Sequence, residues 1–209
     1  VDSMSYNGVG LNQTLDVQIG SYTVSNIKAG FYNVDLTVNS DPIWTGNYAG
    51  AGFCAEDQPI TPDTYSDYEL YEIVDPVKNG AWLMNQYTST ATTAYKAASL
   101  QVAIWEAVLD PDTFDFSSGN FQVTNSWDTT QSLSYLTALS EADLNSFNTA
   151  AYRIVSDDGI VDENGNWLSG GTQDFIIHNS AVPIPGAGLL LGSGLIGIIG
   201  VFRIRNFQK

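Results

Sequence analysis

Two side chains in this sequence could react with each other, the thiol of Cys54 and the carboxamide of Gln101. Cys54 is the single cysteine of 209 residues, so an intrachain disulfide is excluded. Gln101 lies within LQVAIWE (100–106), where its neighbours are apolar apart from Glu106. A thiol and a carboxamide can condense to a thioester, which is a better acyl donor than an amide because thiolate is a good leaving group. The ordinary alternative is an apolar core cysteine and a buried amide satisfied by backbone groups.

The pattern around Gln101 predicts a mostly buried helix over residues 93–110, stopped by Pro111. Its polar residues form one stripe that includes the position of Ala103. Gln101 is two residues from Ala103, about 200° around a helix, so its amide is expected to face the interior. The stripe consists of Lys96, Ser99, Glu106 and Asp110.

Cys54 is expected at, or just after, the end of a strand. Residues 9–56 alternate polar and apolar types and are rich in β-branched and aromatic residues, which predicts a set of antiparallel strands. A last strand is predicted over 172–178. Cys54 and Gln101 would then come from different kinds of element.

The middle of the chain carries helical patterns. A short helix is predicted over 79–90, and another over 140–156, where Ser140 would be the N-cap and Asp143 follows three residues later. Residues 111–139 are expected to be a polar loop region with one or two short helical pieces. The order of strands, helices and strand predicts an α+β fold, an antiparallel β-sandwich or barrel with a helical insertion.

The composition changes after residue 178, which predicts a domain over 1–178 followed by a linker (179–185) and a hydrophobic tail (186–209). The tail opens with 17 uncharged residues, 186–202, and ends in basic ones. Roughly 17 to 25 apolar residues suffice to span a bilayer, and a basic flank is typical of the cytoplasmic side. A C-terminal hydrophobic helix that sorts or anchors the protein is therefore expected. A buried helix of the domain is less favoured because the segment has no polar face.

The tail VPIPGAGLLLGSGLIGIIGVFRIR resembles the PEP-CTERM sorting signals of Gram-negative bacteria. In those signals a short proline motif precedes a Gly/Leu segment and an arginine-rich end. The motif residues here are Val182, Pro183 and Pro185, with Ile184 where the family usually has Glu. The resemblance implies processing by a sorting protease, an exosortase, and delivery to the cell surface, the outer membrane or the extracellular matrix.

A second resemblance covers roughly residues 50–110. FCAED, AWLMNQY and LQVAIWE together resemble the thioester domains of bacterial surface adhesins. The resemblance implies that Cys54 supplies the sulfur and Gln101 the acyl carbon of an internal thioester. Such a bond must be stored away from water, and the aromatic neighbours that could shield it are Phe53, Trp82 and Trp105.

Composition limits the other function classes. Residues 1–178 hold four basic side chains and all 23 acidic ones, a surface that repels phosphate backbones and excludes nucleic acid as a partner. Few lysines and a start at Val1 rather than Met favour an exported protein whose signal peptide has been removed. His178 is the only histidine and has no triad partner at motif spacing. The acidic turn at 157–166 could hold Ca²⁺ or simply be solvated; no cofactor is predicted.

Two functions follow as expectations. The first is an exported adhesin, not a turnover enzyme, that forms an amide between Gln101 and an amine-bearing surface or matrix target. The second is a structural subunit of an extracellular fibre or matrix. In it the tail packs between subunits, and the Cys54–Gln101 pair is structural or crosslinks through Lys28, Lys78 or Lys96.

Overall fold

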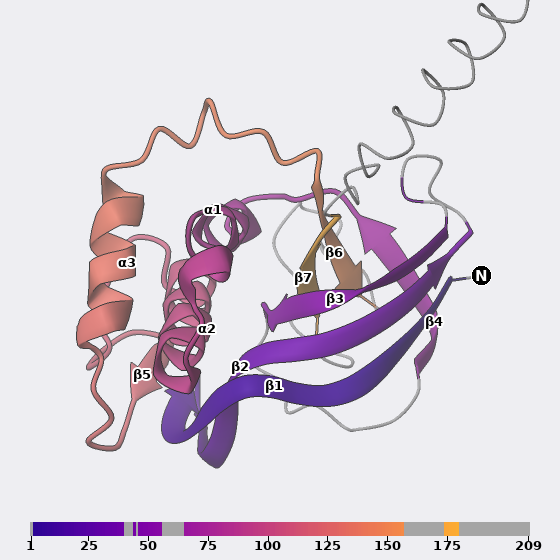
Figure 1. The fold of residues 1–209 in the computed structure, drawn as a ribbon. Coiled ribbons are helices and arrows are strands. Elements are labelled where there is room, and N and C mark those ends of the chain that lie inside the picture. The colour runs from indigo at the N-terminus through magenta and orange to yellow at the C-terminus, as the bar shows by residue number, and fades with distance from the viewer. Residues whose placement is uncertain (1, 40–43, 45, 56–64, 157–173, 180–209) are drawn as a thin grey trace, which may run out of the picture. The chain divides into compact units, whose positions relative to one another are not determined.

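Strands come first in the chain and helices follow, as the sequence predicts. The computed structural model describes residues 2–39, 44, 46–55, 65–156 and 174–179, and their fold is α+β (Figure 1). The elements are β1 (Asp2–Ile19), β2 (Tyr22–Val38), β3 (Gly46–Cys54), β4 (Tyr65–Tyr71), α1 (Val77–Tyr87), a 3₁₀ turn (Thr88–Thr90), α2 (Ala94–Leu109), β5 (Phe121–Val123), α3 (Thr130–Ser140), β6 (Tyr152–Ser156) and β7 (Phe175–His178).

The seven strands form one antiparallel sheet with the order β2-β3-β7-β6-β4-β1-β5. β1 also pairs with β2 along most of its length, so the hydrogen-bonded pairings of six strands close into a ring. On its other side β1 pairs with β4 near Met4 and with β5 at Val17–Ile19. The closed pairing corresponds to the barrel alternative of the predicted fold and not to a sandwich of two sheets.

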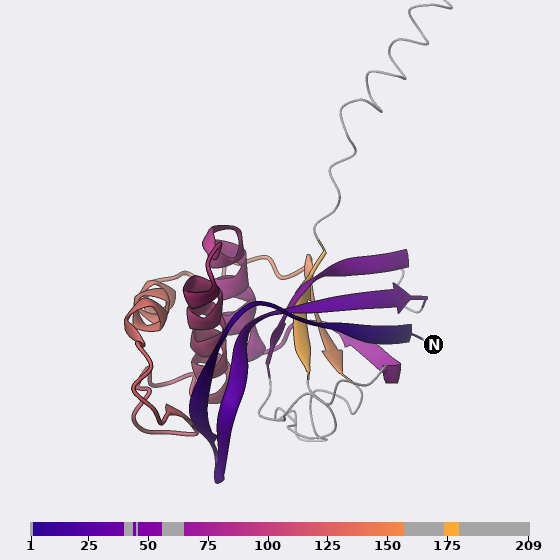
Figure 2. The ribbon, with the colours of Figure 1, turned by 60° about the horizontal axis from the view of Figure 1, so that its bottom comes forward.

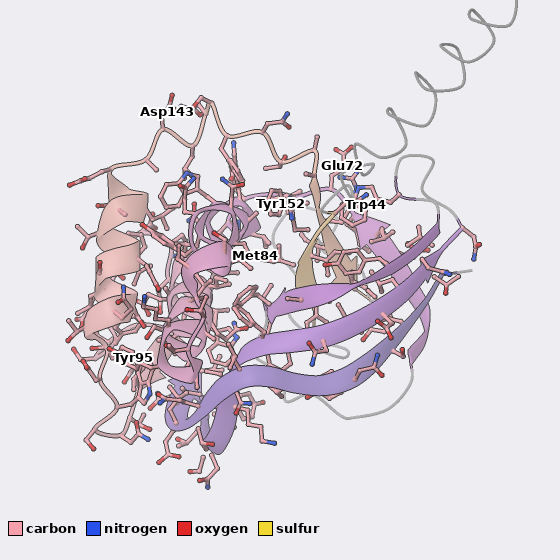
Figure 3. The ribbon with its side chains drawn as sticks, viewed as in Figure 1. Trp44, Glu72, Met84, Tyr95, Asp143 and Tyr152 are labelled. Atoms are coloured by element: carbon pink, nitrogen blue, oxygen red, sulfur yellow. The ribbon has the colours of Figure 1, made fainter. Side chains whose placement is uncertain are left out.

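One face of the ring forms part of the core. In β2 the buried residues Tyr32, Val34, Leu36 and Val38 alternate with exposed polar ones, as expected for a strand with one face in water. β6 differs, because all of its residues are buried and both of its faces are therefore covered. Tyr152, labelled in Figure 3, lies at the start of β6, and its hydroxyl donates to Asn85 Oδ1 of α1 at 2.9 Å.

α2 is the central helix. It packs against α1 and α3 and against β1, β2 and β3, and the helices lie together on one side of the strands in both views (Figures 1 and 2). Thr93 caps its start by accepting from the Lys96 N–H. Every residue from Ala97 to Val108 is buried, including Ser99 and Glu106 of the predicted polar stripe. The prediction of a mostly buried helix is confirmed.

The helix predicted over 140–156 is wrong. α3 ends at Ser140, the chain then forms turns, and β6 begins at Tyr152. Asp143, on the non-helical segment in Figure 3, accepts from the Asn145 N–H through its own side chain, a local bond that competes with helix formation. The apolar run that follows is short and contains β-branched residues, and such a run fits a buried strand as well as a helix.

One further expectation differs from the structure, and another falls outside the described residues. Residues 111–139 contain β5 and the regular 11-residue helix α3, where a loop with short helical pieces was expected. The predicted C-terminal hydrophobic helix belongs to the tail at 186–209, which lies outside the described part of the chain, and nothing supports it. In the part that is described, no helix is long and apolar enough to cross a membrane.

Candidate functional site

The structure brings Cys54 and Gln101 together. Cys54 is the last residue of β3, and Gln101 lies in the middle of α2. The Cys54 N–H donates to Gln101 Oε1 at 3.0 Å, and Gln101 Nε2 donates to the Cys54 carbonyl at 2.8 Å. The carboxamide therefore bonds both main-chain polar groups of the residue whose thiol it would react with. Both predicted element assignments, a strand end and an inward helix face, are confirmed.

Trp105 contacts the sulfur itself. Its indole N–H donates to Cys54 Sγ at 3.2 Å. Trp105 follows Gln101 by four residues on α2, and residues four apart share one face of a helix. Gln101, Cys54 and Trp105 each have 0% of their surface exposed. The helix thus presents an amide to the main chain of Cys54 and an indole donor to its buried thiol.

The neighbours of Cys54 on the sheet are also buried. Cys54 pairs with Phe175 of β7, and the Phe175 ring lies edge-on to Tyr32 with centroids 5.6 Å apart. Burial raises the pKa of the Tyr32 hydroxyl well above its usual value, and negative charge on Cys54 and then on Tyr6 raises it further. This hydroxyl donates to the Lys28 carbonyl at 2.6 Å. The sulfur lies in a site where new charge is costly.

The three predicted shielding residues occupy different places. Trp105 covers the sulfur directly. Phe53 is fully buried, but it precedes Cys54 in a strand, so its side chain points to the opposite face and meets the Phe31 ring edge-on at 5.1 Å. Trp82 is half-buried on α1, where its ring contacts Tyr87 at 6.3 Å. Of the three, Trp105 is the one brought to the pair.

Sequence reasoning missed a clamp at the end of α2. We call residues 115–121 the strap. Glu106 Oε1 accepts from the Asp115 N–H at 2.7 Å, and the Asp110 carboxylate accepts from the N–H groups of Asn120 (2.9 Å) and Phe121 (2.6 Å). The Phe121 ring lies 5.7 Å from Trp105. The two acids therefore hold the strap against the indole that contacts the sulfur.

Glu106 is unusual within this clamp. The residue is fully buried, and Oε2 has no hydrogen-bond partner among the residues that the structure describes. Burial raises the pKa of its carboxyl group to about 8; the Asp115 N–H opposes the shift, and the charges of Asp110 and Asp115 add to it. Glu106 is thus protonated at neutral pH. The sequence does not predict the raised pKa of Glu106, because the burial of this side chain depends on the strap.

A hollow of about 300 Å³ is lined in part by the strap. Phe116 of the strap is among its lining residues and stacks edge-on to Phe121, with centroids 6.2 Å apart. The contacts from the hollow to the sulfur run through Phe116, Phe121 and Trp105.

The other predicted site residues are not described. Val182, Pro183 and Pro185, and the acidic turn at 157–166, lie outside the ranges given above. Within those ranges, no cluster of three or more His, Cys, Asp or Glu side chains could hold a metal ion.

Comparisons with protein-family models, with curated proteins and with solved structures found no match.

Proposed function

We propose that this protein stores an internal thioester between Cys54 and Gln101 and uses it for covalent attachment to an amine on a surface or matrix partner. The observation that carries the proposal is the pair of hydrogen bonds between the Gln101 carboxamide and the Cys54 main chain, at 3.0 and 2.8 Å in a site without exposed surface. Holding two reacting groups in place removes much of the entropic barrier to their reaction. Burial then protects the product from hydrolysis.

The bond-forming step is a condensation. The Cys54 sulfur attacks Gln101 Cδ, the Cδ–Nε2 bond breaks, and the departing nitrogen takes the proton lost by the thiol and leaves as ammonia. Neither carbon nor sulfur changes oxidation state, so no oxidant or reductant is needed. The free energy stored in the weaker acyl bond is then available to a nucleophile.

The attachment step uses that bond once. An amine attacks Gln101 Cδ, a Cδ–N bond forms, the Cδ–S bond breaks, and the sulfur leaves as thiolate that takes up the proton lost by the amine. The product is an amide between Gln101 and the partner, and Cys54 is a free thiol. Since nothing regenerates the thioester, the protein is not a turnover enzyme.

Intact mass spectrometry of the untagged protein tests the proposal. Ring closure should lower the mass by about 17 Da, and methylamine should then add about 31 Da at Gln101. Neither change should occur in Cys54→Ala or in Gln101→Glu. Gln122→Glu, at a half-buried glutamine that bonds the Gly119 carbonyl, is the matched control and should behave as the unmodified chain does.

A full-mass protein whose Cys54 is freely alkylated in fresh, amine-free buffer would contradict the proposal. The same two hydrogen bonds then support the second candidate, in which Gln101 is a structural amide that ties α2 to the end of β3. That role is the one expected of the pair in a fibre or matrix subunit. Export, surface attachment and the sorting tail are proposals that rest on the composition of the chain and on the sequence of residues 179–209.

A further inference from the structure

The Cys54 sulfur is the atom on which negative charge develops in the proposed chemistry. It attacks as a thiolate when the thioester forms, and it leaves as a thiolate when an amine opens the bond. In a site with no exposed surface, water cannot stabilise that charge. A protein donor must do so, or the steps will be slow.

The indole of Trp105 meets this requirement by geometry. Its N–H lies 3.2 Å from Sγ and is carried by a fully buried stretch of α2. A hydrogen bond to an ionised acceptor is about twice as strong as one to a neutral acceptor, so this contact strengthens as the sulfur becomes charged. The nearby Tyr32 hydroxyl is directed elsewhere, because it donates to the Lys28 carbonyl.

We infer that Trp105 is a catalytic residue whose indole N–H stabilises the Cys54 sulfur as thiolate, both when the thioester forms and when an amine opens it. The inference takes the reaction from the proposed function, and it takes the residue from the contact between Trp105 and the sulfur. In the opening step the Cδ–S electron pair goes to Sγ, which accepts a hydrogen bond from the indole N–H. The indole keeps its own proton throughout.

The acyl oxygen has a donor of its own. Gln101 Oε1 accepts from the Cys54 N–H at 3.0 Å, and it carries the charge of the tetrahedral intermediate. Preorganised donors at such an oxygen are typically worth a factor of about 10² to 10³ in rate. Each of the two atoms that gain charge therefore has an N–H donor in place before the reaction begins.

Trp105→Phe tests the role of the indole, because it keeps an aromatic ring and removes the donor. Methylamine consumption of the thioester, followed by intact mass, should slow by at least about tenfold. The matched control is Trp127→Phe, which also removes one indole hydrogen bond, from Nε1 to Gln13 Oε1 at 3.0 Å, and should react at the unmodified rate. An unchanged rate in Trp105→Phe, with a thioester present, would overturn the inference and leave the proposed function standing.

Two further measurements keep the test decisive. If Trp105→Phe does not fold, benzothienylalanine at position 105 replaces the N–H by sulfur at nearly constant shape, and the same slowing is expected. If the unmodified chain forms no thioester, the proposed function fails, and the inference is judged on the thiol. In Gln101→Ala, the ultraviolet absorbance of the Cys54 thiolate should then emerge at higher pH when Trp105 is Phe; emergence at the same pH would overturn it.

Discussion

Gln101 occupies the place where a neighbouring strand would bond the last residue of β3. Its side chain donates to the Cys54 carbonyl and accepts from the Cys54 N–H, the two bonds that a strand partner would make. Buried main-chain groups must be paired, and losing a partner costs more than the bond is worth in water. The unreacted amide therefore has a structural role at the end of β3.

Replacing Gln101 by leucine should destabilise the fold by about 2 to 4 kcal/mol, because two buried main-chain groups lose these bonds. The change is best made in Cys54→Ala, so that no thioester contributes to the difference. Urea unfolding under reducing conditions measures the loss. Gln122→Leu, which removes one bond at a half-buried site, should cost less than about 1 kcal/mol. Equal losses at the two positions would contradict the structural role.

Glu106 makes the stability depend on pH. Its pKa is about 8 in the folded chain and near 4.5 when unfolded, so between these values the folded state holds a proton that the unfolded state has lost. Stability therefore falls as pH rises from about 4.5 to about 8. Glu106→Gln lacks this loss, so its free energy of unfolding should exceed that of the unmodified chain by a margin that grows with pH, on the order of 4 kcal/mol at pH 8.

Thermal unfolding at pH 5 and pH 8 measures that margin. Glu141→Gln, at an exposed position just after α3, is the control and should leave the pH dependence unchanged. Parallel pH profiles for Glu106→Gln and the unmodified chain would show that Glu106 is ionised in the fold.

Among the elements, the strap depends on one backbone conformation. Gly119 has φ +94°, and a Cβ built on it would lie 2.6 Å from Asp110 Oδ2. That carboxylate cannot move freely, because it accepts from the Asn120 and Phe121 N–H groups. The left-handed turn at Gly119 thus lets the strap wrap around the end of α2.

Gly119→Ala should therefore cost about 2 kcal/mol or more, the sum of a strained φ and a displaced carboxylate. Gly8→Ala is the matched control: Gly8 has φ +93°, but nothing lies within 4 Å of its added Cβ. The difference between the two losses in urea unfolding isolates the contact with Asp110. Faster reaction of Cys54 with a thiol reagent in Gly119→Ala than in Gly8→Ala would show that the strap covers the sulfur. Similar reaction rates in the two variants would contradict that role of the strap.

Local patterns predicted α2 and its orientation well. The apolar run, the stop at Pro111 and the position of Gln101 opposite the polar stripe all lie within residues 93–111. These features can therefore be recognised from one short segment, without knowledge of the rest of the fold. The meeting of Cys54 with Gln101 was available only through the resemblance, because it depends on how β3 ends against α2. Spacing along the chain does not contain that information.

The elements that were missed are the ones defined by distant contacts. β6 is buried on both faces, so it lacks the alternation that marks a half-exposed strand. The strap is held by the Glu106 and Asp110 side chains, which accept from main-chain N–H groups. Every residue except proline has such a group, so the sequence does not indicate which ones will bond. The burial and raised pKa of Glu106 follow from the strap and could not be predicted without it.

For the whole molecule, the excess of acidic residues bears on the choice of nucleophile. The net charge is −16 at neutral pH. A strongly negative protein attracts cations over a range set by the ionic strength. A nucleophile that carries protonated amines would therefore be concentrated near this protein, whereas an uncharged nucleophile would not.

If the thioester forms, its rate of reaction with spermidine should fall several-fold when the salt concentration rises from about 0.01 M to about 0.5 M. The rate with hydroxylamine, which is uncharged at neutral pH, should change little. Intact mass over time measures both. Equal salt dependence for the two nucleophiles would mean that the charge of the protein does not select its partner.

The pairing of Cys54 with Phe175 sets an order of events during synthesis. β7 lies between β3 and β6, so the strand that flanks Cys54 is made about 120 residues after the cysteine itself. At the usual pace of translation, the growing chain carries an uncovered sulfur for roughly ten seconds. During that interval the thiol is open to oxidants, and Gln101 has no closed site in which to meet it. The thioester would therefore belong to the finished chain, formed after the last strand completes the ring.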